Sequence, residues 1–155
     1  FDNLERCFNA PVVIAGHPKV DYEKDRNFFG QREVYQERTG ELVRDCRLVV
    51  TNGSTADNFA VLWKKPLLLV TTDELEQGLH KRYLESECAA LKTQIVNADS
   101  PLDDIHWVSL SQKPIAQYAD YQNQVIKKEG TQETNSWEIF LDFLKKEKNP
   151  QDTRI

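Results

Sequence analysis

The sequence contains no methionine, and its first residue is Phe1. Because translation normally starts at methionine, we expect the chain of 155 residues to be an excised piece of a longer protein, with the missing part at least N-terminal. No apolar run approaches the roughly 20 residues that a membrane-spanning helix needs, and no signal peptide is visible. We therefore expect a cytoplasmic domain.

Cysteine and histidine are scarce, with three of each, and both are widely spaced. The spacing of Cys7, Cys46 and Cys88 makes no zinc pattern and favours reduced thiols. The chain also lacks a Gly-x-Gly-x-x-Gly fingerprint and a Gly-x-x-x-x-Gly-Lys-Ser/Thr loop. These absences argue against a metal site, a classical dinucleotide site and a P-loop.

Positive charge is also in short supply, because 25 acidic residues outnumber 20 basic ones and leave a net charge of −5. This balance does not favour nucleic-acid binding. The length suits one core. We expect a single domain over residues 1–148 and a frayed tail over residues 149–155.

Short apolar runs alternate with helical patterns along the chain. The expected strands are 11–15, 32–36, 48–51 and 67–70, with an edge strand at 95–98 or 105–110. The expected helices are 39–46, 55–63, 80–92, 115–128 and 136–148, with Thr39 and Asp73 as caps. This order predicts an α/β fold in which helices cover both faces of a parallel sheet. Trp63, Trp107 and Trp137 are expected to pack in the core or between helices.

Gly53, Ser54 and Thr55 follow one apolar strand and precede a helix. A helix start offers unpaired N–H groups and partial positive charge, which suit a phosphate. Gly53 permits close approach of a ligand to the backbone, and the two hydroxyls add donors. The alternative is that Ser54 or Thr55 simply caps the helix.

Gly16, His17, Pro18 and Lys19 follow the first apolar strand. An imidazole at this position can hydrogen-bond a phosphate oxygen and stabilise negative charge on a departing nucleotide phosphate. The alternative is a loop histidine that bonds only the main chain. Because ligands of parallel sheets bind outside the carboxyl ends of the strands, both segments are candidates for one pocket.

The pairing of His17-Pro18 with Ser54-Thr55 resembles the HP and Ser/Thr motifs of bacterial sialyltransferases, polysialyltransferases and Kdo transferases of the GT-B type. The segments 46–56, 58–62 and 65–66 resemble capsule and surface-polysaccharide transferases, as do residues 126–131 and 137–139. The likeness covers about residues 11–143. Many such transferases carry a histidine just before Gly-Ser, where this chain has Asn52.

The resemblance implies a Rossmann-like domain that forms the donor-binding half of a glycosyltransferase. The donor would be a CMP-sugar of the sialic acid or Kdo type, held by Gly16, His17, Pro18, Lys19, Gly53, Ser54 and Thr55. His17 would be catalytic, by stabilising the leaving phosphate, and no cofactor or metal is expected. The glycan acceptor would bind a missing N-terminal domain, and the full-length protein could associate peripherally with the inner face of the membrane.

Three alternatives stay open. The first is a UDP-sugar transferase or a UDP-sugar epimerase-like domain. The second is a non-catalytic α/β interaction module of the receiver type, although His17 and Asn52-Gly53-Ser54 stand where a receiver needs acidic residues. The third is a degenerate domain that only packs against its missing partner.

Overall fold

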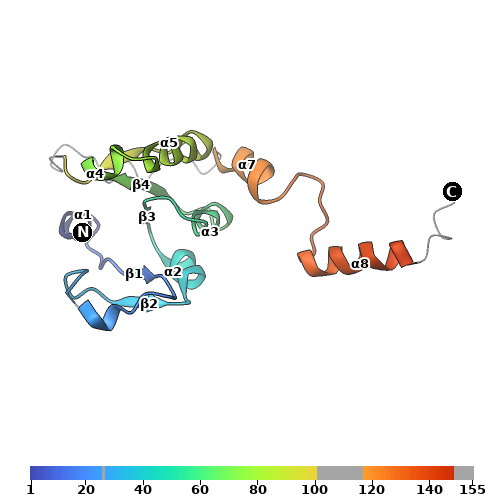
Figure 1. The fold of residues 1–155 in the computed structure, drawn as a ribbon, viewed down its shortest axis with the longest axis horizontal. Coiled ribbons are helices and arrows are strands. Elements are labelled where there is room, and N and C mark those ends of the chain that lie inside the picture. The colour runs from blue at the N-terminus through green and yellow to red at the C-terminus, as the bar shows by residue number, and fades with distance from the viewer. Residues whose placement is uncertain (26, 101–116, 149–155) are drawn as a thin grey trace.

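The computed structural model describes residues 1–25, 27–100 and 117–148, which form a mixed α/β chain (Figure 1). The strands are β1 (Ile14–Gly16), β2 (Val34–Gln36), β3 (Val49–Thr51), β4 (Leu67–Thr71) and β5 (Ile95–Asn97). The helices are α1 (Asp2–Phe8), α2 (Thr39–Asp45), α3 (Asp57–Leu62), α4 (Asp73–Glu76), α5 (His80–Leu91), α7 (Tyr118–Tyr121) and α8 (Ser136–Lys148), with a 3-10 turn η1 (Tyr22–Asp25) and a π-helical turn η4 (Gln122–Ile126).

The strands lie in two small sheets, and every pair is parallel. One sheet has the order β3-β4-β5 and the other contains β1 and β2. Each predicted strand is present, including the edge strand near residues 95–98, but β1 begins at Ile14 instead of residue 11 and β2 begins at Val34 instead of residue 32. The alternative edge strand, 105–110, lies outside the described residues. The expectation of a single sheet is not met, because β1 pairs only with β2 among the described strands.

The core is built around β4, whose side chains alternate between the two faces of its sheet. Leu67 and Leu69 are buried against α3, α5 and α7, while Leu68 is buried on the other side with Leu4 of α1. Helices therefore cover both faces of the three-stranded sheet. This arrangement explains why the strand is a continuous apolar run rather than an alternating one.

The first strand is less buried than its apolar run predicts. Val13 is 38% exposed and Ala15 is also exposed. The physical reason is the two-stranded sheet, which leaves β1 with β2 as its one partner. Gly16 is the buried end of this strand, and a Cβ there would lie 2.7 Å from Val34 Cγ1.

Several helix boundaries and caps differ from the predictions. Thr39 is the first helical residue of α2 and not its cap, which is Arg38. Asp73 likewise begins α4, while Thr72 caps it by accepting a hydrogen bond from the Leu75 amide. Of the helix expected over 115–128, residues 115 and 116 lie outside the described residues, and the described part consists of α7 from Tyr118 and the π-helical turn that ends at Ile126. Helix α1 was not predicted at all.

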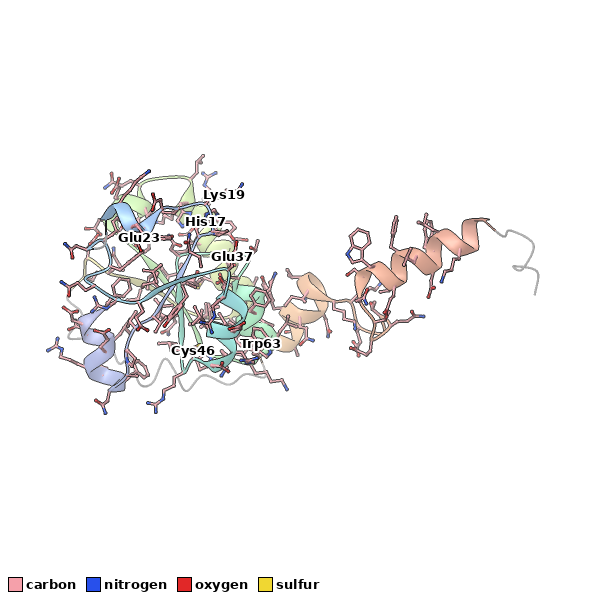
Figure 2. The ribbon with its side chains drawn as sticks, turned by 90° about the horizontal axis from the view of Figure 1, so that it is seen from below. His17, Lys19, Glu23, Glu37, Cys46 and Trp63 are labelled. Atoms are coloured by element: carbon pink, nitrogen blue, oxygen red, sulfur yellow. The ribbon has the colours of Figure 1, made fainter. Side chains whose placement is uncertain are left out.

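The prediction of core or inter-helix packing is wrong for Trp137 but is met by Trp63, whose ring lies 3.5 Å from the position that a Cβ of Gly40 on α2 would occupy. Trp63 is 39% exposed and stacks on Phe59 with ring centroids 5.4 Å apart. Trp137 is 75% exposed on α8, which stands away from the rest of the described chain (Figures 1 and 2). Trp107 lies outside the described residues, as does the tail 149–155. Within the described ranges, no helix has the length and apolar character needed to cross a bilayer.

Candidate anion-binding loops

The loop of residues 52–55 leaves the carboxyl end of β3 through a left-handed glycine. Gly53 has a φ of 94°, and its N–H donates to Thr51 Oγ1 at 3.2 Å. A Cβ on Gly53 would lie 2.6 Å from Tyr83 Cε1 and 2.9 Å from Glu87 Oε2. The loop therefore lies directly against α5, and its close approach requires glycine.

Ser54 acts as the cap of the turn that leads into α3. Its hydroxyl oxygen accepts from the Ala56 amide at 3.2 Å, and Asp57 Oδ2 accepts from the Ser54 amide at 2.9 Å. The Asp57 amide in turn donates to the Ser54 carbonyl at 2.9 Å. This reciprocal pair resembles a capping box. Helix α3 starts at Asp57, two residues after the predicted start at Thr55, and its N-cap residue is Ala56, so Ser54 closes the preceding turn and is not the helix cap.

Asp57 is a site residue that the sequence reasoning missed. The side chain is 1% exposed, and burial is the main cause that raises the pKa of Asp57 to about 7, with the Glu87 charge adding to it. Asp57 Oδ1 and Glu87 Oε2 are buried without a hydrogen-bond partner in the described structure. The Ser-x-x-Asp spacing was a readable signal for the Ser54–Asp57 pair. Nothing local in the sequence marks Glu87, which comes from α5.

Helix α5 also holds the loop through its first residue. His80 Nε2 lies 2.8 Å from the Asn52 carbonyl oxygen, so this nitrogen carries the proton and donates. Asn52 thus helps to anchor the loop through its main-chain carbonyl group. Ser54 and Thr55 are exposed, although the Ser54 hydroxyl oxygen already accepts a hydrogen bond from the Ala56 amide.

The loop of residues 16–19 follows β1 and is held by main-chain contacts. The His17 amide donates to the Tyr22 hydroxyl at 2.9 Å, and Gln36 Nε2 donates to the His17 carbonyl at 2.8 Å. His17 Nδ1 accepts from the Lys19 amide at 3.1 Å. Its proton in the neutral ring therefore lies on Nε2, which remains available as a donor. The side chains of His17 and Lys19 are both exposed (Figure 2).

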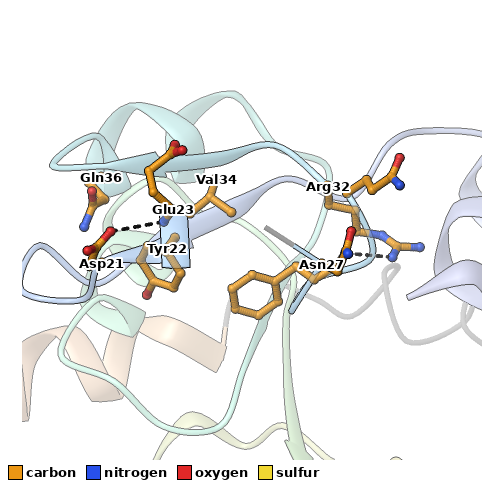
Figure 3. Close-up of a pocket in the computed structure, with 9 residues that line it drawn as sticks. Asp21, Tyr22, Glu23, Asn27, Arg32, Val34 and Gln36 are labelled. Atoms are coloured by element: carbon orange, nitrogen blue, oxygen red, sulfur yellow. Dashed lines mark hydrogen bonds between the residues drawn. The ribbon is translucent and has the colours of Figure 1, made fainter. Parts of the chain in front are cut away.

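A cavity of about 590 Å³ opens beside the 16–19 loop, between η1 and β2 (Figure 3). Tyr22 and Gln36 line it and also hold the His17 backbone. Arg32 contributes to the wall, but its guanidinium is engaged by Glu5 and Asp2. Neither His17 nor Ser54 lines this cavity.

The two predicted loops thus belong to different sheets. Gly16, His17, Pro18 and Lys19 are fastened to β2 and η1, whereas Gly53, Ser54 and Thr55 are fastened to α3 and α5. In the described ranges, no hydrogen bond or ion pair links one loop to the other. The same ranges contain no group of three or more His, Cys, Asp and Glu residues placed to hold a metal ion.

No family model matches the chain, and comparisons with curated proteins and with solved structures give no significant match.

Proposed function

We propose that the chain is the donor-binding half of a glycosyltransferase that takes its sugar from a CMP-sugar. The observation that carries the proposal is the position of the two polar loops. His17 follows β1, which ends at Gly16, and Ser54 follows β3, which ends at Thr51. Both strands are parallel to their neighbours, and carboxyl ends of parallel strands are where phosphates and nucleotides bind.

In this proposal the two loops grip the donor phosphate from two sides in a Rossmann-like arrangement. His17 donates from Nε2 to the leaving phosphate and stabilises its charge. Lys19, two residues on, adds a positive charge next to Gly16 and Pro18. Ser54 and Thr55 donate from their hydroxyls, and Gly53 allows the nucleotide to approach the backbone.

The partners follow from the same proposal. The acceptor would be a growing capsule or surface glycan, bound by an N-terminal half in the full protein, and the cleft between the halves would be the reaction site. The work would take place in the bacterial cytoplasm, with peripheral contact to the membrane. Neither a metal nor a cofactor has a role, and nucleic acid is not a partner.

A second candidate is a non-catalytic domain that keeps the fold but not the phosphate site. One observation favours it: the Ser54 amide, a donor that a phosphate would use, is already bonded to Asp57 Oδ2. A carboxylate at this position also repels a phosphate. The two candidates make opposite predictions for nucleotide binding.

An NMR titration of the chain with CMP, and separately with UDP, tests the proposal. We expect CMP to shift the amide resonances of residues 16–19 and 53–55 together, and His17→Ala to weaken binding. A stronger response to UDP would favour a UDP-sugar enzyme. No response of either loop to either nucleotide would refute the transferase proposal and favour the non-catalytic domain.

A further inference from the structure

The carboxyl groups of Asp57 and Glu87 interact beside the 52–55 loop, where burial, the charge of Glu87 and its hydrogen bond all raise the pKa of Asp57. Asp57 Oδ1 and Glu87 Oε2 are both buried, and neither has a hydrogen-bond donor as partner in the described structure. An ionised carboxylate can only accept hydrogen bonds. Buried acceptors without a donor are rare and unfavourable. One hydrogen placed between the two groups would satisfy both oxygens.

Among the described residues, no positively charged side chain acts on Asp57 to balance a second negative charge. Burial and the Glu87 carboxyl outweigh the Ser54 amide and the Thr51 side chain, which both hydrogen-bond Asp57 and act to lower its pKa. The other polar and titratable groups that interact with the pair come from β3, α5 and α7, and they are Thr51, Tyr83, Tyr118 and Tyr121. His80, also on α5, contacts the Tyr83 ring and the Asn52 carbonyl. Neither lysine nor arginine is among the groups that shift the pKa of Asp57.

The pair also touches the loop itself. Glu87 Oε2 lies 2.9 Å from the position that a Cβ of Gly53 would occupy, so it rests against the Gly53 backbone. Asp57 reaches the same loop through the Ser54 amide. A change in the charge of the pair therefore acts on both sides of the loop at once.

We propose that Asp57 and Glu87 hold one proton between them, and that this proton fastens the 52–55 loop to α5. While the proton is present, an O–H···O bond joins the two carboxyls and Gly53 stays against α5. When the proton is released to solvent, two buried negative charges face each other in a region of low dielectric. The loop and α5 then separate enough to admit water. The inference deepens the proposed function, because this loop would hold the donor phosphate.

The test is an NMR titration of the nucleotide-free chain from about pH 5.5 to 8.5. This window brackets the pKa of Asp57, which burial raises to about 7. The resonances followed are the Gly53 and Ser54 amides and the side-chain carboxyl carbons of Asp57 and Glu87. We expect the Asp57 carboxyl carbon to report the loss of the proton, and the loop amides to move with the same midpoint. Exchange protection of the Ser54 amide, corrected for intrinsic rates, should fall by about tenfold or more, since one unit of pKa coupling corresponds to tenfold.

Two variants and one control separate the pair from its neighbours. Asp57→Asn and Glu87→Gln each place a permanent N–H donor between the groups, so the loop should stay closed and show no transition. Either variant suffices if the other fails to fold. Because histidines in general titrate near neutrality, His80→Gln is the control, and the transition should persist in it.

Three results would overturn the proposal. The loop amides of the unaltered chain could stay constant, the two carboxyls could both be ionised at the acid end, or the transition could vanish in His80→Gln and survive in both amide variants. No nucleotide is present in these measurements. Failure of CMP to bind would therefore refute the proposed function without touching this inference, and the reverse also holds.

Discussion

Ser54 and Asp57 hold each other through two hydrogen bonds of 2.9 Å, one from the Ser54 amide to Asp57 Oδ2 and one from the Asp57 amide to the Ser54 carbonyl. The pair closes the turn between β3 and α3. It also means that the Asp57 carboxyl group already accepts a hydrogen bond from the loop that would bind a phosphate. The stability of the turn and its chemistry are thus properties of the same two residues.

We expect Asp57→Ala to destabilise the chain by about 1–3 kcal/mol, because it leaves the Ser54 amide unpaired and Glu87 buried alone. Ser54→Ala removes the weaker hydroxyl cap alone and should cost about 0.5–2 kcal/mol. Urea denaturation followed by circular dichroism measures both. If Asp57→Ala lowers the free energy of unfolding no more than Ser54→Ala does, the buried carboxyl group has no stabilising partner in the folded chain.

The raised pKa of Asp57 gives stability a definite pH dependence. The pKa is about 7 in the folded chain and near the ordinary 3.8 in the unfolded one. Between these values the folded chain holds a proton that the unfolded chain has released. The free energy of unfolding should therefore fall as the pH rises from about 4 to 7, by at most about 4 kcal/mol, and level off above that range.

The measurement is urea denaturation at several pH values between about 5 and 8 for the unaltered chain and for Asp57→Asn, in which this group no longer titrates. We expect the downward slope in the first and a flatter curve in the second. Glu5, Asp45 and Asp120 have lowered pKa values, because arginine or lysine bonds to them, so their contributions change only at more acidic pH. Parallel curves for the two proteins would contradict the prediction.

Gly53→Ala should disrupt the contact between the loop and α5. The added Cβ would lie 2.6 Å from Tyr83 Cε1 and 3.3 Å from Leu84 Cδ1, and the φ of 94° is itself unfavourable for alanine. Gly130→Ala is a matched control, because its φ is 80° and no atom lies within 4 Å of the new Cβ. Left-handed backbone alone costs roughly 1–2 kcal/mol. Thermal denaturation should show a clearly larger loss for Gly53→Ala, and equal losses would mean that the loop yields freely.

Lys64→Gly should stabilise the chain. Lys64 follows the C-terminal end of α3 with a φ of 54°, a conformation in which glycine is favoured. Relief of this strain is expected to add about 0.5–1 kcal/mol. Glu85→Gly, at an exposed position in the middle of α5, should lower stability by a similar amount. A loss of stability in both variants would show that the Lys64 side chain makes a contact worth more than the strain.

The elements of the three-stranded sheet were predictable because their signals are local. The apolar run of β4 and the helical spacing of α5 and α8 each lie within one element, and the observed bounds match the predicted ones within about two residues. Helix α1 escaped because its one buried residue, Leu4, is too little to make a periodic pattern. The exposure of β1 depends on which strands neighbour it, and that is not a local property.

The candidate site was predictable in part for the same reason. Both loops follow strands as expected, while Ser54 closes the turn before α3, whose N-cap residue is Ala56. The partner of Asp57 could not be predicted, because Glu87 comes 30 positions later on another helix. The exposure of Trp137 was also missed, since large aromatic residues signal burial on average and this one is an exception.

Helix α8 has 13 residues, and the side chains of Trp137, Phe140, Leu141 and Phe143 on it are exposed. Isolated helices of this length are only marginally formed in plain water. The helix content of this segment therefore depends on what contacts its exposed aromatic side chains. It should rise when detergent micelles or trifluoroethanol replace water there. Concentration-dependent self-association and retention on hydrophobic resins are the practical signs to watch for during purification.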